Sequence, residues 1–314
     1  MTGTVIKSTG SWLTVLTGEG DVFNCRLRGK FRMKGIKSTN PVAVGDRVEF
    51  DVPEDKDAGV IHKILPRHNY IIRKATKLSK VSHIIASNID QALVVVTVAF
   101  PRTSSGFIDR FLVTTEAYHI PAVIVFNKID IYDEKMSRQH QALVDIYTKA
   151  GYKCMAVSAL RGDNIDELKE MLKGKTNLFS GHSGVGKSAL INAIEPGLKL
   201  KTREISAYHK KGMHTTTFAE MFPLSFGGYI IDTPGIKEFA LVDFDRKEIA
   251  ERFPEMRKYM HNCRFNNCIH VNEPGCAVKE AVEKGEISLS RYENYLGILN
   301  DDYWEATEKD YRTT

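Results

Sequence analysis

The order of four short motifs along the chain constrains its fold more than any other feature. A glycine-rich loop, GHSGVGKS at residues 181–188, is followed by the tetrapeptide DTPG at residues 232–235. The tetrapeptide NKID at residues 127–130 and the tripeptide SAL at residues 158–160 lie upstream of both. In the common arrangement of such motifs the glycine-rich loop comes first. We therefore expect a circularly permuted α/β domain whose fold brings all four motifs to one site.

The glycine-rich loop has the form G-x-x-x-x-G-K-[ST], which is typical of a phosphate-binding loop. Its glycines allow backbone N–H groups to converge on phosphate oxygens at a helix N-terminus, Lys187 supplies a positive charge, and the Ser188 hydroxyl can bind Mg²⁺. An apolar run at residues 177–180 predicts the strand before the loop, and residues 189–194 predict the helix after it. This context favours a nucleoside triphosphate site over a chance glycine-rich turn.

The two upstream motifs predict which base the site reads. Residues 122–126 form a buried-strand pattern that ends at Asn127, so Asp130 lies near the carboxyl end of a strand, where α/β sheets bind ligands. A carboxylate there accepts hydrogen bonds from guanine N1–H and the exocyclic amine, a pair of donors that adenine lacks. Residues 155–158 predict another short strand, after which the backbone N–H of Ala159 can point at guanine O6. The sequence favours GTP over ATP, although each motif alone also fits a polar surface turn.

The downstream half of the site is expected to hold magnesium and the γ-phosphate. Asp232 ends a short predicted strand, and we expect its carboxylate in the outer coordination sphere of Mg²⁺. The backbone N–H of Gly235 can contact the γ-phosphate. Thr216, in the loop GMHTTT at residues 212–217, is expected to join Ser188 in binding Mg²⁺. A strand start is the alternative explanation for this run of threonines.

The residue that orients the attacking water is the least certain part of the site. Ile236 stands where many signalling GTPases have a water-orienting glutamine, and isoleucine forms no hydrogen bond with water. Hydrolysis is therefore expected to be slow until a partner helps, or to use another residue, for which His214 is the local candidate and a surface histidine the alternative. We assign catalytic roles to His214, Lys187 and Thr216. The predicted nucleotide-binding residues are Asn127, Lys128, Asp130, Ser158, Ala159, Gly181, His182, Ser183, Gly184, Val185, Gly186, Lys187, Ser188, Asp232 and Gly235.

A group of cysteines and a histidine follows the nucleotide motifs. Cys263, Cys268, His270 and Cys276 offer three thiols and one imidazole, a set suited to one structural Zn²⁺. Disulfides are the competing interpretation, but three clustered cysteines leave one unpaired. The sequence has no secretory signal and no apolar stretch long enough to span a membrane, so we expect a cytoplasmic protein with reduced thiols. Spacing favours His270 over His261 as the fourth ligand.

The N-terminal part of the chain predicts a small β-barrel. Short alternating runs are separated by Gly, Asp and Pro turn signals over residues 1–67. Basic residues recur at every second position from Arg26 to Lys34, and residues 1–80 contain 15 Lys and Arg against 8 Asp and Glu, a surplus of +7 in a chain of net charge +5. With Trp12, Phe23 and Phe31 available for stacking, this pattern favours RNA binding over a solvated face around an aromatic core.

The chain resembles the ribosome small-subunit-dependent GTPases of bacteria, the RsgA type, over essentially its whole length. The likeness is carried by the loop GHSGVGKS, by NKID, by the spacing of the four zinc ligands and by the switch signature at residues 212–217, where Met213 departs from the family's basic or polar residue. The resemblance implies GTP hydrolysis stimulated by the small (30S) ribosomal subunit, a role in late maturation of that subunit, and contacts of the barrel and the zinc module with 16S rRNA. It also implies that His214 is important for hydrolysis.

The predicted organisation is multidomain α/β. We expect an oligonucleotide-binding (OB) barrel at residues 1–67, a linker at 68–88, a permuted GTPase domain at 89–242 and a helical zinc module at 243–314, in a monomer. Two other functions remain open from the residues alone. A nucleotide-gated RNA chaperone would use hydrolysis only to reset its cycle, and a small-molecule kinase would use ATP, against which Asp130 argues.

Overall fold

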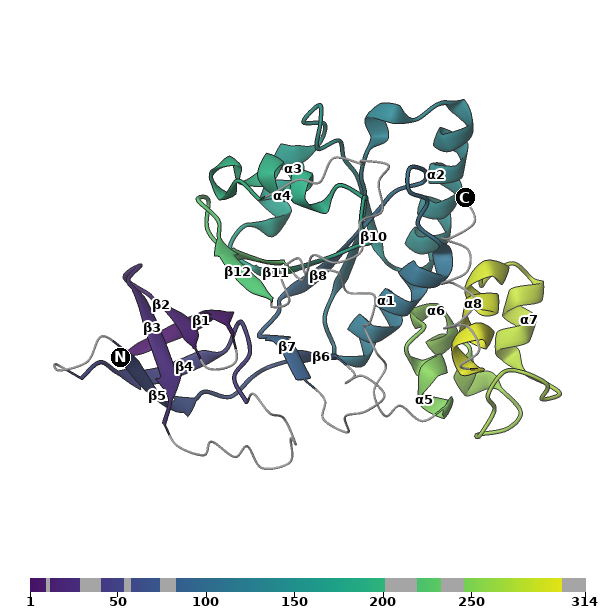
Figure 1. Cartoon of the computed structure of the whole chain (residues 1–314). Coiled ribbons are helices and arrows are strands. Elements are labelled where there is room, and N and C mark those ends of the chain that lie inside the picture. The colour runs from purple at the N-terminus through teal and green to yellow at the C-terminus, as the bar shows by residue number, and fades with distance from the viewer. Residues whose placement is uncertain are drawn as a thin grey trace, which may run out of the picture.

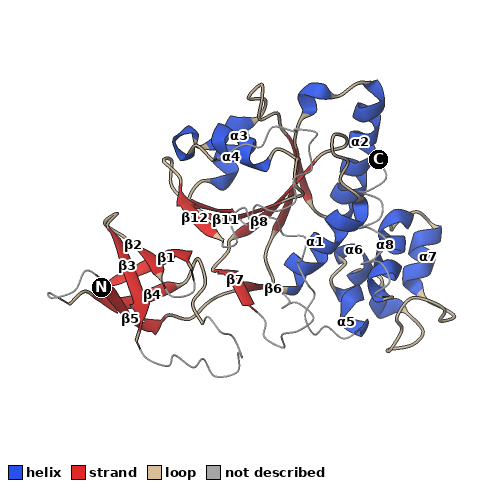
Figure 2. Cartoon of the chain, in the orientation of Figure 1, coloured by secondary structure: helices blue, strands red, loops and turns tan. Residues whose placement is uncertain are grey.

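The computed structural model describes residues 1–9, 12–28, 41–53, 58–73, 83–200, 219–232 and 246–300. Within these residues the chain forms a barrel, a central α/β domain and a helical C-terminal module, arranged in that order across the molecule (Figure 1). Figure 2 shows that the strands lie in the first two parts and that the third is helical. This is the fold class that the sequence predicts.

The barrel is built from five strands that alternate between buried and exposed residues. They are β1 (Thr2–Ser8), β2 (Leu13–Thr17), β3 (Val22–Leu27), β4 (Arg47–Asp51) and β5 (Gly59–Ile64). The strand order is β1-β2-β3-β5-β4, and pairing of β1 with β4 closes the barrel. The inward side chains include Val5, Val15 and Phe50, none of which is exposed. Because closure leaves few free strand edges, a barrel of this size can be stable with a small core.

The interval predicted to be a linker contains a two-stranded ribbon. Strand β6 (Tyr70–Arg73) pairs antiparallel with β7 (His83–Ser87). A buried ion pair holds this region against the barrel, because Arg67 Nη2 lies 2.5 Å from Asp46 Oδ2 and the Ser87 hydroxyl donates to Asp46 Oδ1 at 2.6 Å. The sequence analysis missed these strands because they are short and lie on either side of a basic, polar stretch.

The central domain is a mixed sheet of order β10-β9-β8-β11-β13-β12, in which β12 alone runs antiparallel to its neighbour. The strands are β8 (Gln91–Val96), β9 (Ala122–Phe126), β10 (Lys153–Ala156), β11 (Thr176–Ser180), β12 (Glu220–Pro223) and β13 (Tyr229–Asp232). The helices are α1 (Ser105–Ala117), α2 (Glu134–Ala150), α3 (Ile165–Leu172) and α4 (Lys187–Ile194), with short 3₁₀ turns η1 (Ile129–Ile131) and η2 (Pro196–Leu198). In Figure 1, α3 and α4 cover one face of the sheet and α1 and α2 the other.

The alternation of side chains along β8 explains this two-sided packing. Every residue of β8 is buried, and Ala92, Val94 and Val96 pack toward α1 and α2 while Leu93 and Val95 pack toward α3 and α4. A strand that is covered on both faces needs a continuous apolar run, and that is the pattern of this segment. Helix α2 is bounded by its own sequence, since the Asp133 carboxylate caps its N-terminus and Gly151 ends it in a left-handed conformation.

The junction created by the permutation is satisfied by buried amides. The chain passes from α3 to β11 through residues 173–175, and the Asn177 side-chain amide donates to the carbonyls of Leu172, Lys175 and Tyr229, each at 2.9 Å. Gln91 donates to Asn177 Oδ1 at 2.7 Å. These bonds pair the carbonyls that a chain reversal leaves without ladder partners.

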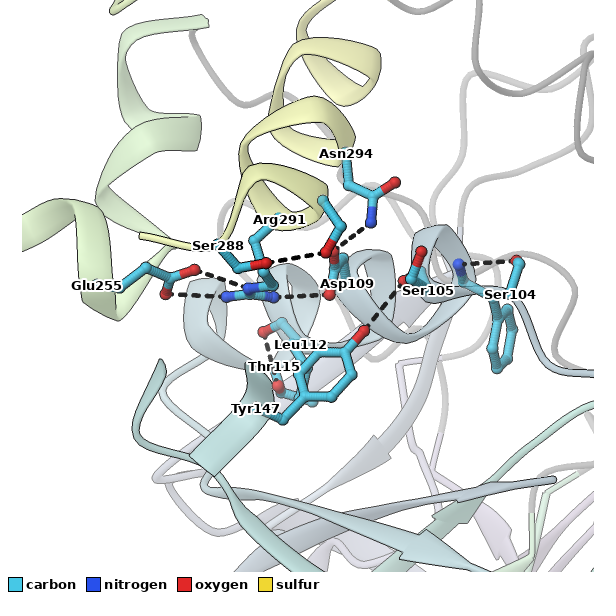
Figure 3. Close-up of polar contacts among 12 residues, drawn as sticks. Ser104, Ser105, Asp109, Leu112, Thr115, Tyr147, Glu255, Ser288, Arg291 and Asn294 are labelled. Carbon is cyan, nitrogen blue, oxygen red and sulfur yellow. Dashed lines mark hydrogen bonds and ion pairs between the residues drawn. The ribbon is translucent and has the colours of Figure 1, made fainter. Parts of the chain in front are cut away.

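The C-terminal module consists of short helices around a buried cluster. They are α5 (Arg246–Glu251), α6 (Pro254–Arg257), α7 (Ala277–Glu283) and α8 (Leu289–Leu299), with a 3₁₀ turn η3 (Met260–Asn262). Helix α8 packs against α1, and the contact is polar and buried. Arg291 on α8 donates to Asp109 on α1 and to Glu255 on α6, and Asn294 donates to Asp109 at 2.5 Å (Figure 3).

Candidate functional site

The phosphate loop lies between β11 and α4, at the carboxyl edge of the sheet. Lys187 and Ser188 are the first two residues of α4, so the N-terminus of this helix opens directly from the loop. Gly186 has a φ of 87°, and a Cβ there would lie 2.5 Å from the side-chain nitrogen of Asn127. Only glycine fits this position, because any side chain would strain the backbone and push the base motif away.

The motif at residues 127–130 is hydrogen-bonded to the phosphate loop although 51 residues or more separate them in the chain. Asn127 Nδ2 donates to the carbonyl of Val185 at 2.9 Å. Lys128 Nζ donates to the carbonyl of Gly184 at 2.6 Å, and burial lowers the pKa of this lysine while Asp130 opposes the shift. Both bonds couple the position of the base motif to that of the phosphate loop.

The tripeptide at residues 158–160 joins the same cluster. The Ser158 hydroxyl donates to Asp130 Oδ1 at 2.5 Å, which orients the carboxylate that we expect to read guanine. The backbone N–H of Ala159, which we expected to face guanine O6, donates to Asn127 Oδ1 at 3.2 Å. Three segments from the ends of β9, β10 and β11 therefore meet at one place, as the doubly wound topology requires.

The downstream half of the site is represented by Asp232, the last residue of β13. Its Oδ1 lies 3.0 Å from Lys187 Nζ, so the two motifs that hold phosphate and magnesium in P-loop proteins are in contact. Strands β11 and β13 are adjacent and parallel, which places their ends side by side. His214, Thr216 and Gly235, together with Met213 and Ile236, lie outside the described residues.

The remaining predicted loop residues occupy distinct surroundings. The His182 ring lies against Phe107 of α1, with centroids 3.7 Å apart, and Ser183 and Gly184 are exposed. Gly181 approaches β8 closely, since a Cβ there would lie 2.5 Å from the carbonyl oxygen of Val95. The structure thus brings together all predicted nucleotide-site residues within its described part, namely Asn127, Lys128, Asp130, Ser158, Ala159, Gly181, His182, Ser183, Gly184, Val185, Gly186, Lys187, Ser188 and Asp232.

The C-terminal module holds a second candidate site. The ligand atoms of Cys263, Cys268, His270 and Cys276 all lie within 4.8 Å of one another, and His270 Nδ1 is 3.6 Å from Cys263 Sγ and 3.4 Å from Cys276 Sγ. A tetrahedral zinc ion with bonds of about 2.0 to 2.3 Å requires separations of about 3.5 to 3.8 Å. The donor set and its spacing therefore fit zinc, and His261 is not part of the cluster.

The surroundings of the four ligands favour metal over disulfide chemistry. All five cysteines are free thiols, and burial raises the pKa of Cys268 to about 12, so a thiolate there needs a cation beside it. Burial also lowers the pKa of His270, which favours the neutral imidazole that binds metal. The ligand loop is held by α8, because the hydroxyl of Tyr292 donates to the carbonyl of His270 and that of Tyr295 to the carbonyl of Ile269, both at 2.6 Å.

On the barrel, the described residues divide the predicted stacking groups. Trp12 is 40% exposed, and the Arg26 guanidinium carbon lies 3.9 Å from the centre of a Trp12 ring. Phe23 packs against Phe50 in the core, with ring centroids 5.4 Å apart. Phe31 and the basic residues 30, 32 and 34 lie outside the described part of the chain. Barrel and central sheet are continuous, because Lys7 of β1 pairs with Glu220 of β12.

Two features were missed by the sequence analysis. The loop after β8 contacts both the base motif and the phosphate loop, since the Phe100 carbonyl accepts a hydrogen bond from Lys128 at 2.6 Å. The buried group of Arg291, Asp109 and Glu255 joins the C-terminal module to α1. A signal for the second was available, because Asp109 is a carboxylate within the apolar face of α1.

A phosphate loop, a base motif and an Asp-x-x-Gly segment in permuted order on a doubly wound sheet define a circularly permuted P-loop GTPase. Comparison with known proteins agrees: a family model described as RsgA GTPase matches residues 64–242, and one described as RsgA N-terminal domain matches residues 2–61. The chain belongs to the RsgA GTPase family.

Relatives and solved structures match along almost the whole chain. "Small ribosomal subunit biogenesis GTPase RsgA" of Flavobacterium johnsoniae is 56% identical, with 100% of this chain and 95% of the relative covered. The protein of the same name from Bacteroides fragilis is 56% identical over 96% of this chain and 97% of its own length. A crystal structure of YjeQ from Thermotoga maritima has 42% identity and a TM-score of 0.78, covering 96% of this chain and 97% of its own. YloQ, described as a circularly permuted GTPase, has 31% identity and a TM-score of 0.72, with coverages of 96% and 94%.

Membership of this family implies Mg²⁺ together with GTP, and the cluster of three cysteines and a histidine is compatible with zinc. Among the helices that the structure describes, none is long and apolar enough to cross a bilayer.

Proposed function

We propose that this chain is a GTPase of small ribosomal subunit biogenesis, which acts late in maturation of the 30S subunit and hydrolyses GTP fastest when bound to that subunit. The observation that carries the GTP site is the pair of hydrogen bonds from Asn127 and Lys128 to the phosphate loop. The names of the Flavobacterium and Bacteroides relatives support the ribosomal role.

In the proposed site, Asp130 reads guanine and Lys187 holds the β- and γ-phosphates. Ser188 and Thr216 bind Mg²⁺, Asp232 orients water in its outer sphere, and the other predicted loop residues contact phosphate through their backbone. His214 orients the attacking water. Contact between Lys187 and Asp232 supports this assignment, because both groups belong at the phosphate end of the nucleotide.

The partner surfaces lie at the two ends of the chain. The barrel of residues 1–67 is proposed to bind 16S rRNA, supported by its basic surplus and by the exposed Trp12 with Arg26 stacked on it. The linker region 68–88 joins it to the GTPase domain, residues 89–242. The module of residues 243–314 is proposed to bind one structural zinc and to provide a second rRNA contact. We propose a cytoplasmic monomer.

Steady-state hydrolysis tests the proposal directly. Without its partner the protein is expected to turn over near 10⁻⁴ to 10⁻³ s⁻¹, roughly the intrinsic rate of GTPases that lack a complete catalytic set. Purified small subunits should raise this rate by at least about 100-fold, since a partner can supply up to about 10⁵-fold. Large subunits serve as the control for non-specific RNA effects. An unchanged rate with small subunits at saturating GTP would contradict the ribosome-stimulated mechanism.

A further inference from the structure

Phe100 has an unusual position in the loop that joins β8 to α1. Its side chain is 65% exposed, and its backbone is left-handed with a φ of 52°. A bulky residue rarely adopts this conformation, which costs about 1 to 3 kcal/mol and is concentrated at functional sites such as ligand clamps. Neither core packing nor backbone preference accounts for an aromatic ring held in solvent here.

The loop is fixed to both halves of the nucleotide site. The Phe100 carbonyl and the Gly184 carbonyl accept hydrogen bonds from the same Lys128 ammonium, each at 2.6 Å. The next residue, Pro101, packs on the phosphate loop, since a Cβ on Gly184 would lie 3.3 Å from its ring. The Thr97 hydroxyl donates to the Pro101 carbonyl and braces the turn. The ring of Phe100 is therefore held at a defined place beside the site.

Two other exposed apolar side chains lie in the neighbouring loops. Ile131 follows Asp130 and is 40% exposed, and Leu160 follows Ala159 and is 85% exposed. Strands β8, β9 and β10 are adjacent and parallel, so the loops that follow them share one edge of the sheet. The phosphate loop takes the charged part of a nucleotide, which leaves the flat base and the ribose to this apolar side.

We propose that Phe100 contacts the nucleoside part of bound GTP and GDP, with its ring packed against the ribose and guanine. This inference rests on the proposed nucleotide site. Covering an exposed aromatic ring with the ligand removes apolar surface from water, which stabilises the complex. The phosphates bind through loop N–H groups and Lys187, so the ring adds affinity for the nucleoside and none for the phosphates alone.

The test uses the full-length protein and two probes, GDP and inorganic tripolyphosphate, measured by calorimetry with Mg²⁺. Phe100→Ala should raise the Kd for GDP about tenfold, which corresponds to about 1.4 kcal/mol, and leave the Kd for tripolyphosphate unchanged. Phe100→Tyr retains the ring and should bind GDP within about twofold of the wild type. The control is Phe265→Ala, which removes a 41% exposed ring from the C-terminal module and should change neither affinity.

A proximity measurement adds a second criterion. In Phe100→Trp, tryptophan emission should be quenched by bound N-methylanthraniloyl-GDP more strongly than in the wild type, whose own Trp12 and Trp304 provide the baseline. Unchanged GDP affinity in Phe100→Ala would overturn the proposal and leave the ring for a protein or RNA partner. Equal weakening of GDP and tripolyphosphate would also overturn it, since the loop would then act through Gly184. Failure of the nucleotide site itself is distinct, because the wild type would then bind ADP as tightly as GDP.

Discussion

The buried contact between α1 and α8 allows a quantitative prediction for Arg291→Met. The guanidinium lies 2.7 Å from Asp109 Oδ1 and 2.7 and 3.0 Å from the two oxygens of Glu255. Exposure is 1% for Arg291, 0% for Asp109 and 4% for Glu255, so water screens none of these charges (Figure 3). The arginine is thus the main compensation for two carboxylates inside the interface.

Removing the arginine leaves both carboxylates buried without their counter-charge. Loss of one partner from a buried ion pair costs about 3 to 5 kcal/mol, and methionine recovers only part of the packing. A loss of about 3 kcal/mol corresponds to at least about 100-fold more frequent opening of the interface. Arg257→Met is the matched control, because Arg257 also joins α6 to α1 through Glu116 at 3.0 Å but is 45% exposed. We expect no more than about 1 kcal/mol for this exposed pair.

The defect should depend on pH in a defined direction. Burial raises the pKa of Asp109 and Arg291 opposes that shift, so the pKa rises further in Arg291→Met. A native carboxyl group whose pKa is raised above its unfolded value binds a proton more tightly in the folded protein. Stability relative to the wild type should therefore improve as the pH falls from about 8 to about 5.5. Asp109→Asn with Glu255→Gln should relieve the defect at every pH.

Hydrogen exchange measured by mass spectrometry is the suitable assay, because a protein with several domains has no single free energy of unfolding. Amides of α8 should exchange at least about 100-fold faster in Arg291→Met at neutral pH, while those of the barrel strands β2 and β3 stay as in the wild type. If α8 in Arg291→Met exchanges no faster than in Arg257→Met, the interface does not depend on this buried group and the reasoning is wrong.

Three further outcomes follow from the structure. Lys187→Ala should abolish GTP hydrolysis with an unchanged circular dichroism spectrum, because the side chain faces Asp232 at the site edge and supports no core; retained turnover would mean that the phosphate site is elsewhere. Cys276→Ser should weaken zinc binding by at least about tenfold, measured by metal content after dialysis against a weak chelator, and an unchanged content would remove this thiol from the ligand set. Asn177→Ala should lower stability toward urea by about 2 to 4 kcal/mol, because it leaves the carbonyls at the permutation junction unpaired, and a loss below about 1 kcal/mol would show that the junction relaxes.

Much of the fold was predictable because its signals are local. Strict alternation marks the strands of the barrel, a continuous apolar run marks β8, and capping residues such as Asp133 and Gly151 bound α2. Ribbon β6–β7 was missed because its stability comes from contacts with the barrel, such as the Asp46 ion pair with Arg67. Contacts between distant segments leave no periodic pattern in the chain.

The same division holds for the candidate site. The residue types for phosphate, guanine and metal binding, and their inverted order, can be read directly from the motifs, since each chemistry needs particular side chains at short fixed spacing. Their meeting at one edge, with Lys128 bound to Gly184, depends on the parallel pairing of β8, β9 and β11. The place of Phe100 beside that lysine, and the burial of Arg291 between two carboxylates, were decided only by tertiary structure. A side chain's environment is set by segments that pack against it from elsewhere in the chain, and those segments are known only once the chain has folded.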